Sequence, residues 1–95
     1  MELSEVEQRI LKALLKKDKM TARELVDASH SSTSVLNPSL EHLIKLGLVN
    51  EEREHSFPRR RFVILTESGK EVAQLLVEIE RIVEMKKASK SLSSS

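Results

Sequence analysis

Apolar residues recur at every third or fourth position in the first part of the chain, which is the spacing of one helical face. Ser4 precedes the first of these runs and Glu7 follows three residues later, the spacing of an N-terminal capping box. Thr21 and Glu24 repeat that spacing before a shorter run. The pattern therefore predicts a helix over residues 4–17 and a second, short helix that begins at Thr21.

A third apolar face at helical spacing ends at Gly47, a common C-terminal stop for a helix. Pro38 lies within this segment and cannot donate the backbone hydrogen bond that a helix interior requires. Either Asn37 caps a helix that begins at Pro38, or a helix that begins near Thr33 is kinked at the proline. We expect the first arrangement, with a loose turn over residues 33–36 followed by a regular helix.

After Gly47 the apolar pattern changes to that of extended chain. Residues 48–55 and 60–66 form two runs of strand type, and Pro58 favours a turn between them. An antiparallel hairpin is therefore predicted. Both faces of its second strand are apolar, so another part of the protein must cover the second face.

The last apolar stripe predicts a long terminal helix. Thr66 is placed as its N-cap, and the helix is expected over residues 67–88, which is too long for a small body to cover. The serine-rich end, residues 89–95, is expected to be a disordered tail. The remaining part, residues 1–66, is expected to form the body.

The composition is that of a single globular domain. Of the 95 residues, 39% are apolar and 33% are charged, and the formal net charge is +1. The absence of cysteine excludes thiolate metal sites and suits a reducing cytoplasm. No apolar run approaches the ~20 residues of a membrane span, and the opening MELSEVEQRI lacks the order of a signal peptide. We therefore expect a cytoplasmic protein without a membrane partner.

Candidate catalytic chemistry is sparse. His30, His42 and His55 lack the helical or hairpin spacing of a metal-ligand pair. The three glutamates of the first predicted strand have no partner for acid–base catalysis. With only two glycines, the chain has no glycine-rich phosphate loop. The sequence predicts no enzyme, no metal site and no cofactor.

The order of these elements is typical of a winged helix-turn-helix protein. The segment ELVDASHSSTSVLNPSLEHLIKLGLV (residues 24–49) resembles the helix-turn-helix of prokaryotic winged-helix regulators, including its final L-x-x-L-x-x-x-G-L-V. The segment RRRFVILTESGKE resembles the wing of the MarR family, which carries arginines before an L-T-x-x-G helix start. The matching residues are Leu40, Leu43, Gly47, Leu48, Val49, Leu65, Thr66 and Gly69.

The resemblance implies an α+β fold with a three-helix core, a two-stranded wing and a long C-terminal dimerisation helix. The wing of MarR proteins pairs an acidic residue with its arginine, whereas this chain has Phe57 at that place. MarR proteins also dimerise through helices from both ends. The first predicted helix of this chain already belongs to the core, so the chain is similar to small archaeal winged-helix proteins that pair through one C-terminal helix.

Within such a fold, residues 1–66 are expected to bind double-stranded DNA. The third helix would lie in the major groove, where Asn37 can pair with adenine and neighbouring polar side chains can hold phosphates. The wing would place its arginines in the minor groove or on phosphates, with Phe57 packed on their stems or wedged at a sugar edge. The expected DNA-binding residues are Ser32, Ser34, Asn37, Ser39, His42, Lys45, Arg59, Arg60 and Arg61.

Plainer roles remain open, because the serines and Asn37 also suit caps and turns, and the arginines also suit a solvated hairpin tip. The terminal helix is expected to form a homodimer, because its apolar stripe continues past the turns that the body can cover. The expected interface residues are Leu75, Leu76, Ile79, Ile82 and Val83.

The sequence therefore predicts a homodimeric transcriptional regulator that prefers particular DNA sequences. The alternatives are an architectural chromatin protein and a winged helix that binds other proteins. A small-molecule effector is not identified, and the small core leaves little room for its pocket, unless the dimer interface forms one.

Overall fold

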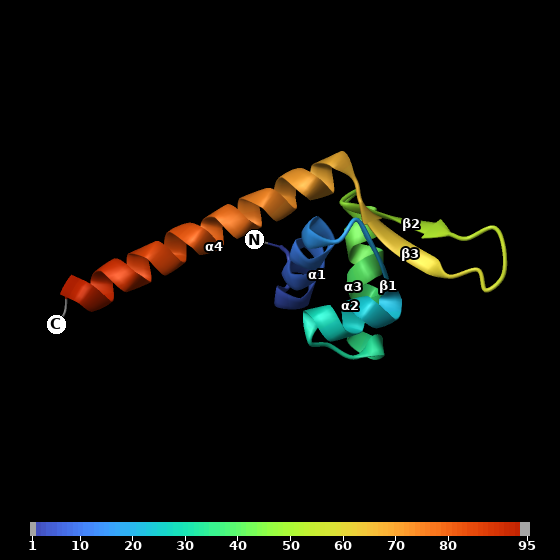
Figure 1. The fold of residues 1–95 in the computed structure, drawn as a ribbon, viewed down its shortest axis with the longest axis horizontal. Helices are drawn as coiled ribbons and strands as arrows, with labels where there is room; N and C mark the ends of the chain where they lie inside the picture. Colours follow the sequence, from blue (N-terminus) through green and yellow to red (C-terminus); the bar gives the residue numbers. More distant parts are fainter. Residues whose placement is uncertain (1, 94–95) are drawn as a thin grey trace.

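The structure, a computed structural model, describes the backbone of residues 2–93 and the side chains of residues 2–86. Four helices and three strands follow one another in this part of the chain (Figure 1). They are α1 (Glu5–Lys16), β1 (Lys19–Thr21), α2 (Ala22–Ser29), α3 (Thr33–Lys45), β2 (Val49–Arg53), β3 (Arg61–Leu65) and α4 (Glu67–Ser93).

The two predicted capping boxes are confirmed. The Ser4 hydroxyl accepts a hydrogen bond from the Glu7 backbone N–H at 3.1 Å, and the Glu7 carboxylate accepts one from the Ser4 N–H at 2.8 Å. Thr21 and Glu24 form the same reciprocal pair at the start of α2. Because each box satisfies two backbone donors at a helix start, the sequence signals were sufficient to place both starts.

The expected start of the third helix at Pro38 is wrong. Helix α3 begins at Thr33, after Ser32, and continues through the proline. This start brings Leu36 into the helix, where it is fully buried beside Leu40 and Leu43. The proline removes one helical hydrogen bond on an exposed face, where water can solvate the freed carbonyl, and burial of Leu36 offsets that loss.

The sheet has three strands in the order β1-β3-β2, one strand more than the predicted hairpin. Strand β1 lies at the junction between the two predicted helices, where the sequence predicted no strand, and it pairs antiparallel with β3, Met20 opposite Val63. The pairing buries Met20 and places the Lys19 ammonium 4.6 Å from the centre of the Phe62 ring. The Lys19 side chain thus covers part of the second face of β3, which the sequence left unexplained.

One hydrophobic core joins the three helices of the body to the sheet. Its members are almost all aliphatic, as expected for a chain with 2% aromatic residues. The buried apolar residues are Ile10, Leu11, Leu14, Met20, Leu25, Leu36, Leu40, Leu43, Leu48, Val49, Val63, Ala73 and Leu76.

The start of α4 is attached to the connection between α3 and β2. The Thr66 hydroxyl donates to the Gly47 carbonyl at 2.6 Å and accepts from the Gly69 N–H at 3.0 Å. A Cβ atom on Gly69 would lie 1.9 Å from the Leu48 carbonyl oxygen. Only glycine therefore permits the first turn of α4 to approach this close to the backbone before β2.

Beyond its first turns α4 leaves the body (Figure 1). The helix continues to Ser93, five residues past its expected end, and residues 94–95 of the expected tail lie outside the described residues. The molecule measures 59 × 26 × 22 Å because of this projection. Within the described residues, no helix has the length and apolar character needed to cross a membrane.

Replacing Gly69 by Ala should destabilise the protein by about 1–3 kcal/mol, because the new methyl group overlaps the Leu48 carbonyl and the helix start must move. The sign of this stability change tests the close approach, because Gly→Ala at a helix position with open space around it stabilises a protein by about 1 kcal/mol. Urea denaturation measures the change, and Ser68→Ala on the exposed neighbouring position is the control. A Gly69→Ala variant as stable as the wild type would contradict the close approach.

Candidate nucleic-acid interface

The turn between α2 and α3 is held by buried serine contacts. The side chain of Ser29 is fully buried, and its hydroxyl lies 2.6 Å from the Leu25 carbonyl and 2.7 Å from the Ser31 hydroxyl. His30 follows in the left-handed conformation with φ of 54°, which ends α2. This turn sets the direction in which α3 leaves α2.

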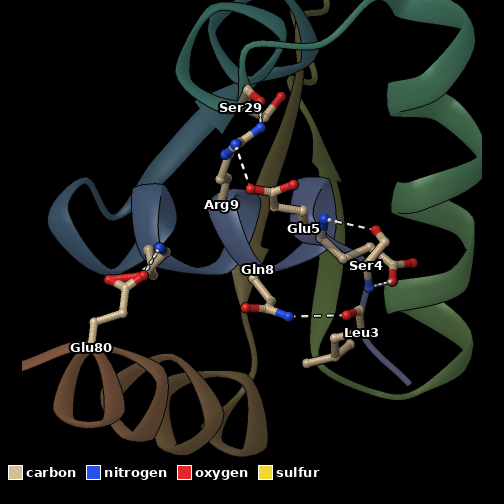
Figure 2. A network of polar contacts seen from close by, with 9 residues as sticks. Leu3, Ser4, Glu5, Gln8, Arg9, Ser29 and Glu80 are labelled. Carbon is tan, nitrogen blue, oxygen red and sulfur yellow. Dashed lines mark hydrogen bonds and ion pairs between the residues drawn. The ribbon is translucent and has the colours of Figure 1, made fainter. Parts of the chain in front are cut away.

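Arg9 connects this turn to α1. Its guanidinium donates to the Ser29 carbonyl at 3.3 Å and to the Glu5 carboxylate at 2.8 Å. Figure 2 shows the Arg9 side chain extending from α1 between these two acceptors. The end of α2 is thereby fixed relative to the central helix.

A second polar contact joins α1 to α3. The Glu7 carboxylate is only 4% exposed at the residue level and lies 2.5 Å from His42 Nδ1. Burial alone would raise the pKa of Glu7, but the hydrogen bond from the Ser4 backbone and the contact with His42 outweigh it, so the pKa lies below the ordinary value of 4.5. The His42 side chain, which is 41% exposed, therefore connects α3 to α1 at the surface instead of being unpaired.

The outer face of α3 carries a short polar stripe. Ser34, Asn37 and Lys45 are exposed on it, as expected, and Ser34 lies 3.0 Å from the Ser32 hydroxyl. Ser39 is different, because it is 9% exposed and its hydroxyl donates to the Val35 carbonyl at 2.9 Å. The structure thus brings four of the six expected α3 residues to one exposed surface.

Glu41 and Pro38 also lie on this exposed face, between Ser34 and Lys45. Glu41 is not among the DNA contacts predicted from the sequence, because those are cations and neutral polar residues. Its position, seven residues after Ser34, would have placed it on the same helical face. A carboxylate there can accept a hydrogen bond from the amino group of cytosine in the major groove.

The arginines of the wing differ from one another. Arg60 Nε lies 3.1 Å from the Glu54 carboxylate, and the Arg61 guanidinium lies 3.0 Å from that of Glu51. Arg59 is exposed, has φ of 55° and makes no ion pair with the other described residues. Two of the three wing arginines are thus paired with glutamates, one in β2 and one directly after it.

The apolar stripe of α4 divides into a covered and an uncovered part. Leu76 is 5% exposed and belongs to the core, so it is not free to contact a second copy as expected. Lys12 of α1 forms an ion pair with Glu80, seen in Figure 2 where α4 passes α1. The exposed large apolar side chains of α4 are Leu75, Val77, Ile79, Ile82, Val83 and Met85.

An open groove of about 590 Å³ lies between α1 and α4, although the sequence left little room for a pocket. Its lining combines the cations Arg9, Lys12, Lys16 and Lys17 with the apolar residues Ala13, Met20, Ala28 and Val77. Among the described residues, no group of three or more histidines and carboxylates could hold a metal ion.

The three-helix body, the fixed helix-turn-helix and the hairpin define a winged helix-turn-helix fold. Residues 1–67 match the family described as sugar-specific transcriptional regulator TrmB. Because this match covers more than half of the chain, the protein belongs to the TrmB family. A search of curated proteins found no match.

Solved structures similar to this chain are MarR-type regulators, which confirms the resemblance inferred from the sequence. A MarR family transcriptional regulator from Silicibacter pomeroyi is 28% identical, with a TM-score of 0.77 over 92% of this chain and 61% of its own. MepR, a regulator of a Staphylococcus aureus multidrug efflux pump, has 19% identity and a TM-score of 0.81 over 94% of this chain and 66% of its own. PcaV from Streptomyces coelicolor has 24% identity and a TM-score of 0.79 over 93% and 65%. The chain thus spans less than two thirds of the length of each.

Replacing Glu7 by Gln should lower the free energy of unfolding at pH 7 by about 1–2 kcal/mol, because it weakens charge-assisted hydrogen bonds to Ser4 and His42. The folded pKa of Glu7 is lowered, so its contribution is fully present above pH 4.5 and is lost as the pH falls through the folded pKa. The difference between the two proteins should therefore shrink below pH 4.5 in urea denaturation.

Glu5→Gln is the matched control, because Glu5 is an exposed first-turn carboxylate that pairs only with Arg9 among the described residues. It should change stability by less than about 1 kcal/mol. Equal losses for both variants, or a Glu7→Gln effect that is the same at pH 3 and pH 7, would contradict the role assigned to the Glu7–His42 contact.

Proposed function

We propose that this protein is a homodimeric, non-enzymatic regulator that binds double-stranded DNA with sequence preference in the cytoplasm. The observation that carries the proposal is the exposed polar face of α3, whose direction is fixed by the contact of Glu7 with His42 and by the hydrogen bond of Arg9 to the end of α2. In a winged helix-turn-helix protein this helix is the element that enters the major groove. Membership of a family of transcriptional regulators supports the same function.

Base recognition is proposed for the middle of α3. The Asn37 amide can form two hydrogen bonds with adenine, and the Glu41 carboxylate can accept from cytosine. Ser32, Ser34 and Lys45 are placed at the two ends of the same face and suit phosphate contacts. Ser39 and His42 are left out of the direct contacts, because the Ser39 hydroxyl donates to the Val35 carbonyl and the His42 ring, although 41% exposed, is paired with Glu7.

The wing is proposed to contact phosphates or the minor groove chiefly through Arg59. Arg60 and Arg61 already have carboxylate partners. A phosphate must therefore displace a glutamate before it can interact with the full positive charge of either arginine. This limits the sequence-independent part of binding, which comes from phosphate neutralisation. Together with the net charge of +1, it favours a regulator over an architectural protein that coats DNA.

A second copy of this chain is proposed to cover the exposed stripe of α4. From residue 77 to residue 86 every position of α4 is exposed, although Ile79, Ile82 and Val83 are large and apolar. Burial of each such side chain is favourable by about 1.5–3 kcal/mol. The body of the same chain leaves them uncovered, so pairing has a clear driving force.

The sequence spacing suits a helix pair. Leu75 and Ile82 are seven residues apart, as are Ile79 and Lys86, which is the repeat of a coiled-coil seam. A dimer of this kind would present two α3 helices to DNA and would match a palindromic site.

Arg59→Ala should weaken binding to duplex DNA and reduce the steepness of its salt dependence by about 0.9 log unit, the effect of one lost phosphate contact. Arg60→Ala and Arg61→Ala should cost less, because each removes a charge that is already paired. Fluorescence anisotropy with a labelled duplex at several salt concentrations measures both quantities.

Lys16→Ala serves as the control for this series, because it removes one positive charge from the α4 side of α1, where Lys16 lines the groove. Its salt dependence should equal that of the wild type. If Lys16→Ala and Arg59→Ala weaken binding equally, the wing is not the phosphate-binding element. If the wild-type protein shows no salt-dependent duplex binding, the proposed function itself is wrong.

Ile79→Glu combined with Ile82→Glu should convert the protein to a monomer, because two carboxylates would be buried in the seam of α4. Sedimentation equilibrium at micromolar concentration measures the change, and circular dichroism should show that the body remains folded. Gln74→Glu, which adds a carboxylate outside the stripe, should leave the dimer intact. A monomeric wild-type protein under these conditions would contradict the proposed dimer.

A further inference from the structure

The tip of the wing carries a phenylalanine that the protein leaves uncovered. The side chain of Phe57 is 94% exposed, so the expected packing on the arginine stems is wrong. The second phenylalanine, Phe62, lies on β3, where it is half-buried under the ammonium group of Lys19. One of the two aromatic rings of the hairpin is therefore partly covered, by Lys19 of β1, and the other is exposed.

The local backbone explains why no other described part of the chain reaches Phe57. The Arg59 N–H donates to the Ser56 carbonyl at 2.8 Å, which closes a turn with Phe57 and Pro58 at its centre. In Figure 1 this turn is the part of the wing farthest from the three-helix body. Phe57 thus lies in the turn that ends the wing, and its side chain stays uncovered there.

The charges around the tip show which partner suits it. Arg60 and Arg61, nearer the strand, are occupied by Glu54 and Glu51. Arg59 stands next to the apolar pair Phe57–Pro58 and has no carboxylate partner among the described residues. The tip therefore offers a narrow apolar end with one guanidinium at its side.

We propose that Phe57 is a DNA wedge, inserted from the minor groove against a base-pair step while Arg59 contacts the flanking phosphate or groove floor. This inference rests on the proposed DNA binding and adds a residue and a mode of recognition to it. Proteins that bind the minor groove use phenylalanine and proline in this way, and arginine is favoured in the same groove. The apolar tip is too small for the core of a stable protein interface, which needs many more buried residues.

A wedge has a consequence for sequence preference. Partial unstacking costs least at pyrimidine–purine steps such as TA and CA, because these steps are the most flexible. The wing should therefore favour sites that carry such a step beside the segment contacted by α3. Recognition at that position would need no hydrogen bond to a base.

Fluorescence gives a direct test, because the chain contains neither tryptophan nor tyrosine. Phe57→Trp places a single fluorophore at the tip. On addition of duplex DNA its emission should decrease and move to shorter wavelength, and acrylamide should quench it less. Phe62→Trp, a fluorophore on the flank of the same hairpin, is the control and should show a much smaller response.

Phe57→Ala tests the energetic role with the native surface otherwise unchanged. Loss of stacking against a base should weaken binding by about 5- to 100-fold. The salt dependence should stay that of the wild type, because no charge is lost. This pattern differs from that of Arg59→Ala, which lowers the salt dependence.

The results separate the two proposals. If Phe57→Trp binds duplex DNA but its emission does not respond, or if Phe57→Ala binds as tightly as the wild type, the wedge is wrong and DNA binding stands. If the emission of the Phe57→Trp variant shifts with protein concentration in the absence of DNA, a second copy covers the tip and the wedge is also wrong. If neither the variants nor the wild-type protein bind duplex DNA, the proposed function is wrong, and the wedge that rests on it is wrong as well.

Discussion

The arrangement of the body depends on one buried carboxylate. Glu7 caps the start of α1 through Ser4 and at the same time contacts His42 in the third turn of α3. A buried charge is tolerated only when its hydrogen bonds are satisfied, so both partners must stay in place together. Arg9, two residues later on α1, holds the end of α2 through the Ser29 carbonyl. The central helix therefore determines how the helix-turn-helix is presented, although it contributes nothing to the exposed face of α3.

Local signals in the sequence predicted most of the fold. Capping boxes, a glycine stop and a change from helical to extended spacing act over a few residues, so they placed α1, α2, the hairpin and the start of α4. Strand β1 was not predicted, because three residues are too few to show the alternating pattern of a strand. Only pairing with β3 makes them one. The start of α3 was misplaced because the local penalty of Pro38 was weighed without the burial of Leu36.

The candidate site was less predictable, because its residues were chosen by type. Ser39 and His42 have suitable chemistry, yet Ser39 donates to the Val35 carbonyl and the half-exposed His42 is paired with Glu7. The three arginines looked equivalent in the sequence, and only the register of the hairpin gives two of them a glutamate. Leu75 and Leu76 belong to the same apolar stripe. Successive residues of a helix point in different directions, so Leu76 lies in the core and Leu75 is exposed. Each distinction depends on tertiary geometry that residue type does not contain.

The contacts at Gly69 fix the direction in which the long helix α4 leaves the body. Contact of Gly69 with the Leu48 backbone and the hydrogen bond from Thr66 to Gly47 leave the first turn little freedom to tilt. The 27 residues of α4 extend about 40 Å from this pivot, so a rotation of about 10° there would displace the far end by about 7 Å. Along DNA, about 7 Å is roughly two base pairs, at about 3.4 Å each. In the proposed dimer, the rigidity of this small joint would therefore set the distance between the two DNA half-sites.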